Sequence, residues 1–197
     1  MSTASTAQSR NGRLHREDWL RHALETLRRS GESGLRVEPL ARSLGVTTGS
    51  FYWHFKDRQD LLDQVIDHWA TKMTQAIAER MTSDEHPRSQ LSRLLEDVTR
   101  LDRDRYEIAV RNWAAFDAKA ARAVRTVDEC RMAYVKGLFL NLGFSDDQAQ
   151  IRANMLVFYQ LGEAGFSMKD SEARRLELVE MRLAILLCPT EGTASVS

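Results

Sequence analysis

The stretch from Leu35 to Lys56 holds the residues of this 197-residue chain whose types best suit contact with another molecule. Its second half reads Leu-Gly-Val-Thr-Thr-Gly-Ser-Phe-Tyr-Trp-His-Phe-Lys, which brings together hydroxyl, phenol, imidazole and ammonium groups. All of these groups form hydrogen bonds with phosphate oxygens, and Thr or Ser also reaches base edges or a thymine methyl. Gly49 removes a side chain where backbone could approach a duplex closely. The residue types therefore indicate a surface that binds nucleic acid.

Three short elements must position these side chains. An amphipathic helix is expected over 16–29, and a second helix over 37–44 with Pro39 in its first turn, where proline is tolerated. Gly45-Val46-Thr47 makes a tight turn. The segment 48–55 is too short to be stable alone and needs the two preceding helices for support. This pattern is a helix-turn-helix, whose second helix has the right width for a major groove.

Residues 16–80 resemble the tetracycline-repressor (TetR) family of transcriptional regulators. The most specific part is Leu44-Gly-Val-Thr-Thr-Gly-Ser-Phe-Tyr-Trp-His-Phe-Lys-Asp-Arg-Gln-Asp-Leu-Leu62. The resemblance implies an all-α fold. In it, an N-terminal three-helix helix-turn-helix DNA-binding domain is joined by a long helix to a C-terminal helical ligand-binding and dimerisation domain. It also implies a homodimer that binds a double-stranded operator containing an inverted repeat.

The resemblance assigns roles to individual positions. Thr48 and Ser50 are the better candidates for reading bases, whereas Tyr52, His54 and Lys56 would contact phosphates. The candidate DNA-binding residues are Arg36, Val37, Thr47, Thr48, Gly49, Ser50, Tyr52, Trp53, His54 and Lys56.

Four positions near this surface need a separate interpretation. Phe51 and Phe55 are four residues apart and are expected in the core. Trp53 either packs against a neighbouring helix or faces DNA, and both alternatives stay open. Glu38 stands where some relatives have a basic base-reading residue, so the contribution of the helix over 37–44 is open.

The charge distribution agrees with a basic module on an acidic body. The whole chain has 28 basic and 28 acidic side chains, but residues 1–56 carry nine basic and five acidic ones. A polarity of this kind between two parts of a chain is typical of nucleic-acid modules attached to a second domain. Arg10, Arg13 and Arg16 either enter a minor groove or belong to a solvated tail.

A long helix begins at Asp57, which is suited to cap it, and its apolar stripe continues to Ile77. Further helices are expected near 88–102, 105–115, 117–141, 146–167 and 171–187. The expected domains are a disordered tail (1–13), the DNA-binding domain (14–57), a connecting helix (58–80), the ligand-binding and dimerisation domain (81–188) and a second tail (189–197).

The second half mixes charged and aromatic residues among apolar ones, as in a pocket with apolar walls and a few polar groups. The expected ligand-binding residues are Trp113, Asp117, Tyr134 and Tyr159, with plain core packing as the alternative for Trp113. By resemblance to the family's four-helix interface, the expected dimer residues are Met155, Leu156, Leu176, Val179, Leu183 and Leu186.

Several classes of protein and site are excluded or disfavoured. The longest stretch without a charged residue runs from Ser43 to Phe55, which is shorter than a membrane span, and no secretory signal is present, so a cytoplasmic protein is expected. No Glu-x-x-His pair, Gly-x-Ser-x-Gly elbow or Walker loop occurs, so neither catalysis nor a cofactor is expected. The histidines and the two cysteines are too scattered for a metal site.

The main hypothesis is a DNA-binding transcriptional regulator, a repressor released from its operator by an unknown small-molecule effector. Two alternatives remain: a DNA-binding dimer without a ligand, and an all-α small-molecule-binding protein or enzyme that retains a non-functional helix-turn-helix.

Overall fold

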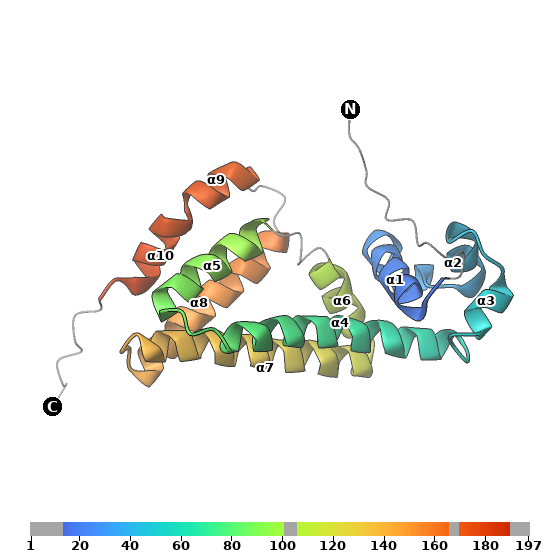
Figure 1. Ribbon diagram of the computed structural model, residues 1–197, viewed down its shortest axis with the longest axis horizontal. Coiled ribbons are helices and arrows are strands. Elements are labelled where there is room, and N and C mark those ends of the chain that lie inside the picture. The colour runs from blue at the N-terminus through green and yellow to red at the C-terminus, as the bar shows by residue number, and fades with distance from the viewer. Residues whose placement is uncertain (1–13, 101–105, 166–169, 190–197) are drawn as a thin grey trace.

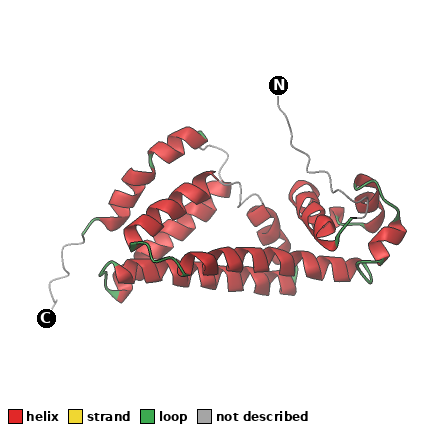
Figure 2. Cartoon of the chain, in the orientation of Figure 1, coloured by secondary structure: helices red, strands yellow, loops and turns green. Residues whose placement is uncertain are grey.

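A computed structural model of the chain describes residues 14–100, 106–165 and 170–189, and every regular element within these ranges is a helix (Figure 2). The expected tail 1–13, and all but the first residue of the tail 189–197, lie outside the described residues. In chain order the elements are α1 (Arg16–Ser30), the 3-10 helix η1 (Glu32–Gly34), α2 (Val37–Ser43), α3 (Thr48–Tyr52), α4 (Arg58–Met81), α5 (Pro87–Arg100), α6 (Glu107–Ala114), α7 (Ala118–Asn141), α8 (Asp146–Gly165), α9 (Glu172–Glu177) and α10 (Val179–Leu187). The all-α fold is therefore confirmed.

Two long helices, α4 and α7, lie side by side and form the spine of the molecule (Figure 1). The helix-turn-helix of α1, α2 and α3 sits at one end of this spine, and α5, α8, α9 and α10 cover the other end. Helix α6 lies between the two groups and packs on both α1 and α7. No helix in the described ranges is long and apolar enough to cross a membrane.

Aspartates fix where both spine helices begin. Asp57 caps α4 by accepting a hydrogen bond from the N–H of Asp60 at 2.8 Å, and Asp117 caps α7 in the same way through Ala120 at 2.8 Å. These carboxylates satisfy free N–H groups and face the positive end of each helix dipole. The expected start of the long helix at Asp57 is confirmed.

The hydrophobic core consists of two clusters. The first joins α1, α2, α3 and the first half of α4 to α6 and the first half of α7, through buried residues such as Val110, Trp113 and Val124. The second joins α5, the second half of α7, α8 and α10. The helix-turn-helix thus shares a hydrophobic core with α6 and α7, which come much later in the chain. This shared core fixes it on the spine.

Two expected helices are shorter than their apolar spacing indicates. The segment expected over 48–55 is helical only from Thr48 to Tyr52 and then turns. The segment expected over 171–187 is two helices, because the chain turns at Leu178 between α9 and α10. Leu178 has φ −85° and ψ −4°, which is close to helical, so the apolar periodicity continues across the break.

Candidate nucleic-acid interface and adjoining cavity

Aromatic packing holds α3 against α1. The ring of Trp19 meets the ring of Phe51 edge to face with centroids 5.6 Å apart, and it meets Phe55 at 6.4 Å. Phe51 and Phe55 are 0% and 2% exposed, which confirms that they belong to the core. Of the three residues between Phe51 and Phe55, Tyr52 and Trp53 point outward and are exposed, whereas His54 is half-buried.

The turn between α2 and α3 depends on Gly45. Its φ is +71°, a left-handed conformation that glycine adopts without a steric penalty. The next N–H, that of Val46, donates to the carbonyl of Ala41 at 3.0 Å and closes the turn. This geometry sets the angle at which α3 leaves α2.

Half of the ten predicted DNA-binding residues are exposed on α3 and its two caps. Thr47, Thr48, Gly49, Tyr52 and Trp53 are exposed, and the last two are 60% and 77% exposed respectively. The exposure of Trp53 favours the interpretation in which it faces outward.

The remaining predicted positions are less uniform. Lys56 is exposed just beyond α3, and Ser50 is half-buried. Arg36 is exposed at the N-cap of α2. Val37 is half-buried and packs against the first core cluster, so only part of its side chain is accessible to DNA.

His54 has a partner within the protein. Its Nε2 lies 3.1 Å from the main-chain oxygen of Leu14, and because a carbonyl only accepts, Nε2 must carry the hydrogen. Nε2 is therefore used within the protein, and only Nδ1 remains for another partner. The geometry therefore favours a role for His54 in holding the chain that leads into α1, in place of the phosphate contact that the family resemblance implies.

Arg58 fastens this unit to the long helix α4. Its Nε donates to the carbonyl of Leu35 at 2.7 Å, and its guanidinium also pairs with the carboxylate of Glu32. At the same corner the N–H of Lys56 donates to Asp60 at 2.9 Å, a bond that lowers the pKa of Asp60. The orientation of α3 is thereby tied to the first turn of α4.

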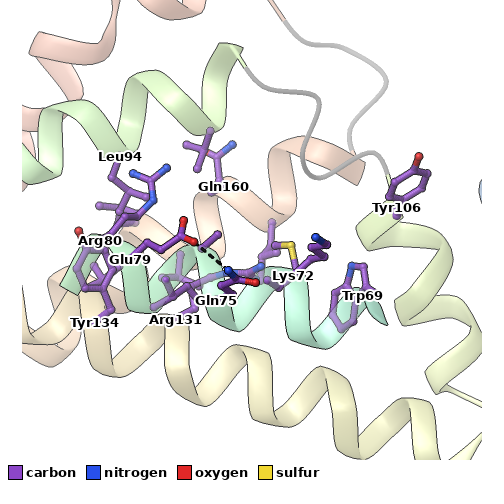
Figure 3. Close-up of a pocket in the computed structure, with 18 of the residues that line it drawn as sticks. Trp69, Lys72, Gln75, Glu79, Arg80, Leu94, Tyr106, Arg131, Tyr134 and Gln160 are labelled. Atoms are coloured by element: carbon purple, nitrogen blue, oxygen red, sulfur yellow. Dashed lines mark hydrogen bonds between the residues drawn. The ribbon is translucent and has the colours of Figure 1, made fainter. Parts of the chain in front are cut away.

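A cavity of about 720 Å³ lies beside α4, with walls from α5, α7 and α8 and a contribution from Arg21 and Leu24 of α1 (Figure 3). Its size is that of a typical small-molecule site. Tyr134 is the one predicted ligand-binding residue that lines it. The hydroxyl of Tyr134 donates to Gln90 at 3.3 Å, and burial raises the pKa of this phenol.

The other three predicted ligand-binding residues lie away from the cavity. Trp113 is buried in the first core cluster, so its alternative interpretation as plain core is the one that holds. Asp117 is occupied as the cap of α7. Tyr159 is 54% exposed on α8, beneath the guanidinium of Arg182 at 4.6 Å from the ring centroid. The structure does not bring these four residues together.

A network of opposite charges forms the wall between α6 and the cavity. Glu107 is only 2% exposed and pairs with Arg111 at 2.6 Å and Arg131 at 3.3 Å. Asp128 completes the network through Arg111 at 2.5 Å. Arg131 also lines the cavity, so the network joins α6 to the cavity wall. The part of the chain that the structure describes contains no group of His, Cys, Asp or Glu arranged to hold a metal ion.

Most of the predicted dimer residues face the interior of the protomer. Leu156, Val179, Leu183 and Leu186 are buried in the second core cluster, and Leu176 is half-buried. Of the predicted set, Met155 is exposed. Large apolar side chains that are exposed on α8 and α10 form another stripe: Ile151, Met155, Phe158 and Tyr159 on α8, and Met181 and Ile185 on α10.

Comparison with known proteins agrees with this geometry. Residues 20–65 match the family of bacterial regulatory proteins called the tetR family. The chain is 30% identical to the class A tetracycline repressor from transposon 1721 of Escherichia coli over 152 residues, which is 77% of this chain and 56% of that repressor. It is 25% identical to the class D tetracycline repressor of Escherichia coli, over 94% of this chain and 71% of that protein.

The solved structure of a TetR-family transcriptional regulator from Bordetella parapertussis has the same fold, with a TM-score of 0.65 and 18% identity. The match covers 88% of this chain and 94% of that one. The chain therefore contains a helix-turn-helix domain that matches the tetR family, and over 77% of its length it is similar to a tetracycline repressor.

Proposed function

We propose that the protein is a homodimeric, sequence-specific DNA-binding transcriptional regulator, acting as a repressor that a small-molecule ligand releases from an inverted-repeat operator. It would act in the cytoplasm, where the DNA is. Residues 14–57 would form the DNA-binding domain, 58–80 the connecting helix, and 81–188 the ligand-binding and dimerisation domain.

The exposed surface of α3 is the observation that carries the DNA-binding proposal. Thr47, Thr48 and Tyr52 point outward from a helix whose opposite side is fixed by buried aromatic rings. Hydroxyl donors on a rigid short helix suit a major groove. Lys56 lies at the same edge and adds a positive charge for a phosphate.

The exposed stripe on α8 and α10 supports dimerisation. A short recognition helix reads only a few base pairs, and two-fold symmetry doubles the site. Phe158 and Ile185 are 61% and 63% exposed, which is unusual for such large apolar side chains. We assign this stripe, in place of the buried leucines, to the interface between protomers.

The position of the cavity supports regulation by a ligand. Its walls include α4, which begins at the DNA-binding corner, and α1, which belongs to the helix-turn-helix itself. A ligand that displaces α4 would change the separation of the two recognition helices. Adjacent major grooves lie about 34 Å apart, and a misfit is met only by deforming DNA.

A binding assay with the promoter region beside the protein's own gene tests the proposal. Full-length protein should retard this DNA in a gel, with an excess of unrelated DNA present, and protection should cover two symmetric half-sites. Equal affinity for promoter and unrelated DNA would contradict it. That result would favour the alternative of an all-α small-molecule-binding protein or enzyme with a non-functional helix-turn-helix.

A further inference from the structure

The cavity beside α4 has a mainly apolar wall. Aliphatic side chains from α1, α4, α5, α7 and α8 contribute to it (Figure 3). Five of them are only half-buried, so each keeps surface that a bound molecule can cover: Met73, Ile77, Leu94, Val98 and Leu161. Such a wall favours a ligand with a mainly apolar body.

The cationic side chains among the described lining residues all have carboxylate partners that lie outside the cavity. The pairs, with their nitrogen–oxygen distances, are Arg21–Asp18 at 2.6 Å, Lys72–Glu17 at 3.7 Å, Arg80–Asp97 at 2.7 Å and Arg131–Glu107 at 3.3 Å. Arg131 belongs to the network of two arginines and two carboxylates described above, which is balanced in charge. His68 adds no charge at neutral pH, because burial and the nearby Lys72 lower its pKa.

Two other lining side chains differ in what they offer a ligand. The indole N–H of Trp69 has no acceptor in the described part of the chain, but it is fully buried, so a molecule in the cavity does not reach it. Glu79, in contrast, is exposed and is the one carboxylate among the described lining residues.

The carboxylate of Glu79 has no cationic partner within the described residues. Its Oε1 accepts a hydrogen bond from the side-chain amide of Gln75 at 3.1 Å, and no contact uses Oε2. Figure 3 shows this bond as a dashed line in the middle of the labelled residues, away from both ends of the cavity. When the paired charges are set against each other, the charge left over at the wall is the negative charge of Glu79.

This carboxylate determines which charge a ligand can carry. A molecule that fills the cavity removes water from Glu79, and a carboxylate that loses water without gaining a partner is costly. A cationic group supplies the partner, whereas a neutral molecule does not. An anion would be repelled by Glu79 and would meet guanidinium groups that are already paired.

We infer that the cavity binds a mainly apolar molecule with a single positive charge, and that this charge lies against Glu79 while the apolar body packs on Ile77 and Leu94. This inference rests on the proposed function, because it names the chemical class of the effector. Glu79 and Ile77 both belong to α4, so the ligand would contact the helix whose first turn is tied to α3.

Three probes with the same ten-carbon chain test the charge preference. Decyltrimethylammonium, decanol and decanoate are titrated into the full-length protein by calorimetry, below the concentrations at which they form micelles. Decyltrimethylammonium should bind more tightly than decanoate by a factor of about ten or more, with decanol between them. A smaller preference over decanoate, equal or tighter binding of decanol, or no binding of the cation would overturn the inference.

Two matched variants test the position of the charge. Glu79→Gln keeps the shape of the side chain and should weaken decyltrimethylammonium by about tenfold, as expected for the loss of a close pair of opposite charges. It should not weaken decanol, because the amide is easier to strip of water than the carboxylate. Glu129→Gln is the control, because it removes an exposed carboxylate that lies outside the cavity and changes the net charge equally.

Equal weakening of decanol and the cation by Glu79→Gln, or an equal effect of both variants on the cation, would refute the assignment. The titrations contain no DNA, so a negative result leaves the DNA-binding proposal standing.

Discussion

The imidazole of His54 holds the main-chain oxygen of Leu14, 40 residues earlier, at 3.1 Å. This bond joins the end of the recognition segment to the chain that enters α1. The family resemblance assigns His54 to phosphate binding, but its Nε2 already makes a contact within the protein.

His54→Ala should therefore lower the free energy of unfolding by about 1 kcal/mol, the usual worth of one hydrogen bond. The salt dependence of DNA binding should stay unchanged. His54→Gln keeps an N–H donor and should restore most of the stability in urea unfolding. If His54→Ala instead lowers the salt slope by one unit, His54 contacts a phosphate after all.

Three substitutions distinguish the contributions that charge, positioning and base reading make to DNA binding. They are made at Lys56, Tyr52 and Thr48. Lys56→Gln should weaken binding to all DNA sequences and lower the slope of log K against log salt by about 0.9, the value for one phosphate contact. Tyr52→Phe should weaken all sequences with a nearly constant slope, because the phenol is uncharged. Thr48→Ala should relax base preference. These effects are measured by fluorescence anisotropy on operator and mismatched duplexes, and a uniform loss for Thr48→Ala would remove it as a base reader.

The exposed stripe on α8 and α10 can be separated from the core beneath it by one pair of variants. Ile185 is 63% exposed and Leu183 is 0% exposed on the same helix. Ile185→Arg should give folded monomers by sedimentation equilibrium, with weak operator binding. Leu183→Arg should unfold the protein, because it places an unpaired charge in the second core cluster. A dimer that survives Ile185→Arg at micromolar concentration would show that this stripe is not the interface.

Local sequence signals predicted the elements of the helix-turn-helix well and the residues around the cavity poorly. The start of α4 follows from a cap residue, Asp57, and the turn before α3 from Gly45, so both depend on neighbours in the chain. The cavity instead gathers residues from five helices that are far apart in the sequence. One of them, Trp69, belongs to the regular apolar stripe of α4, and this pattern predicts that it is a core residue. Only the fold reveals that its N–H has no partner.

The dimer prediction shows a related ambiguity. Helices α8 and α10 each carry two apolar stripes, and periodicity alone cannot tell which one packs within the protomer. Leu183 belongs to the inner stripe and Ile185 to the outer one. The break at Leu178 also has no sequence signal, because neither glycine nor proline marks it and the periodicity continues.

Two histidines should make the protein less stable in mild acid. Burial lowers the pKa of both His22 and His68 below the ordinary value of 6.5, with further lowering from Arg29 and Lys72 respectively. As pH falls below 6.5, the unfolded chain takes up protons before the folded one does, so stability decreases until the folded-state pKa values are passed. Replacing both with Gln should flatten the stability curve between about pH 7 and pH 5 in urea unfolding. An unchanged curve would contradict this origin.

Glu107 should be the most sensitive charged position in the wall between α6 and the cavity. It is 2% exposed and faces two guanidinium groups, so Glu107→Gln keeps the shape and leaves Arg111 and Arg131 to share Asp128. Breaking a buried ion pair on one side costs about 3 kcal/mol, because the remaining charge stays desolvated. Glu129→Gln is the matched control: it removes an exposed carboxylate from α7 and should change the free energy of unfolding by less than about 0.5 kcal/mol.

Because α6 also packs on α1, the loss of stability in the Glu107 variant should appear as a lower unfolding midpoint for the helix-turn-helix. This midpoint is measured by the fluorescence of Trp19 in a protein whose other tryptophans are replaced by Phe. Equal midpoints for the Glu107 and Glu129 variants would show that the network does not hold α6 in place.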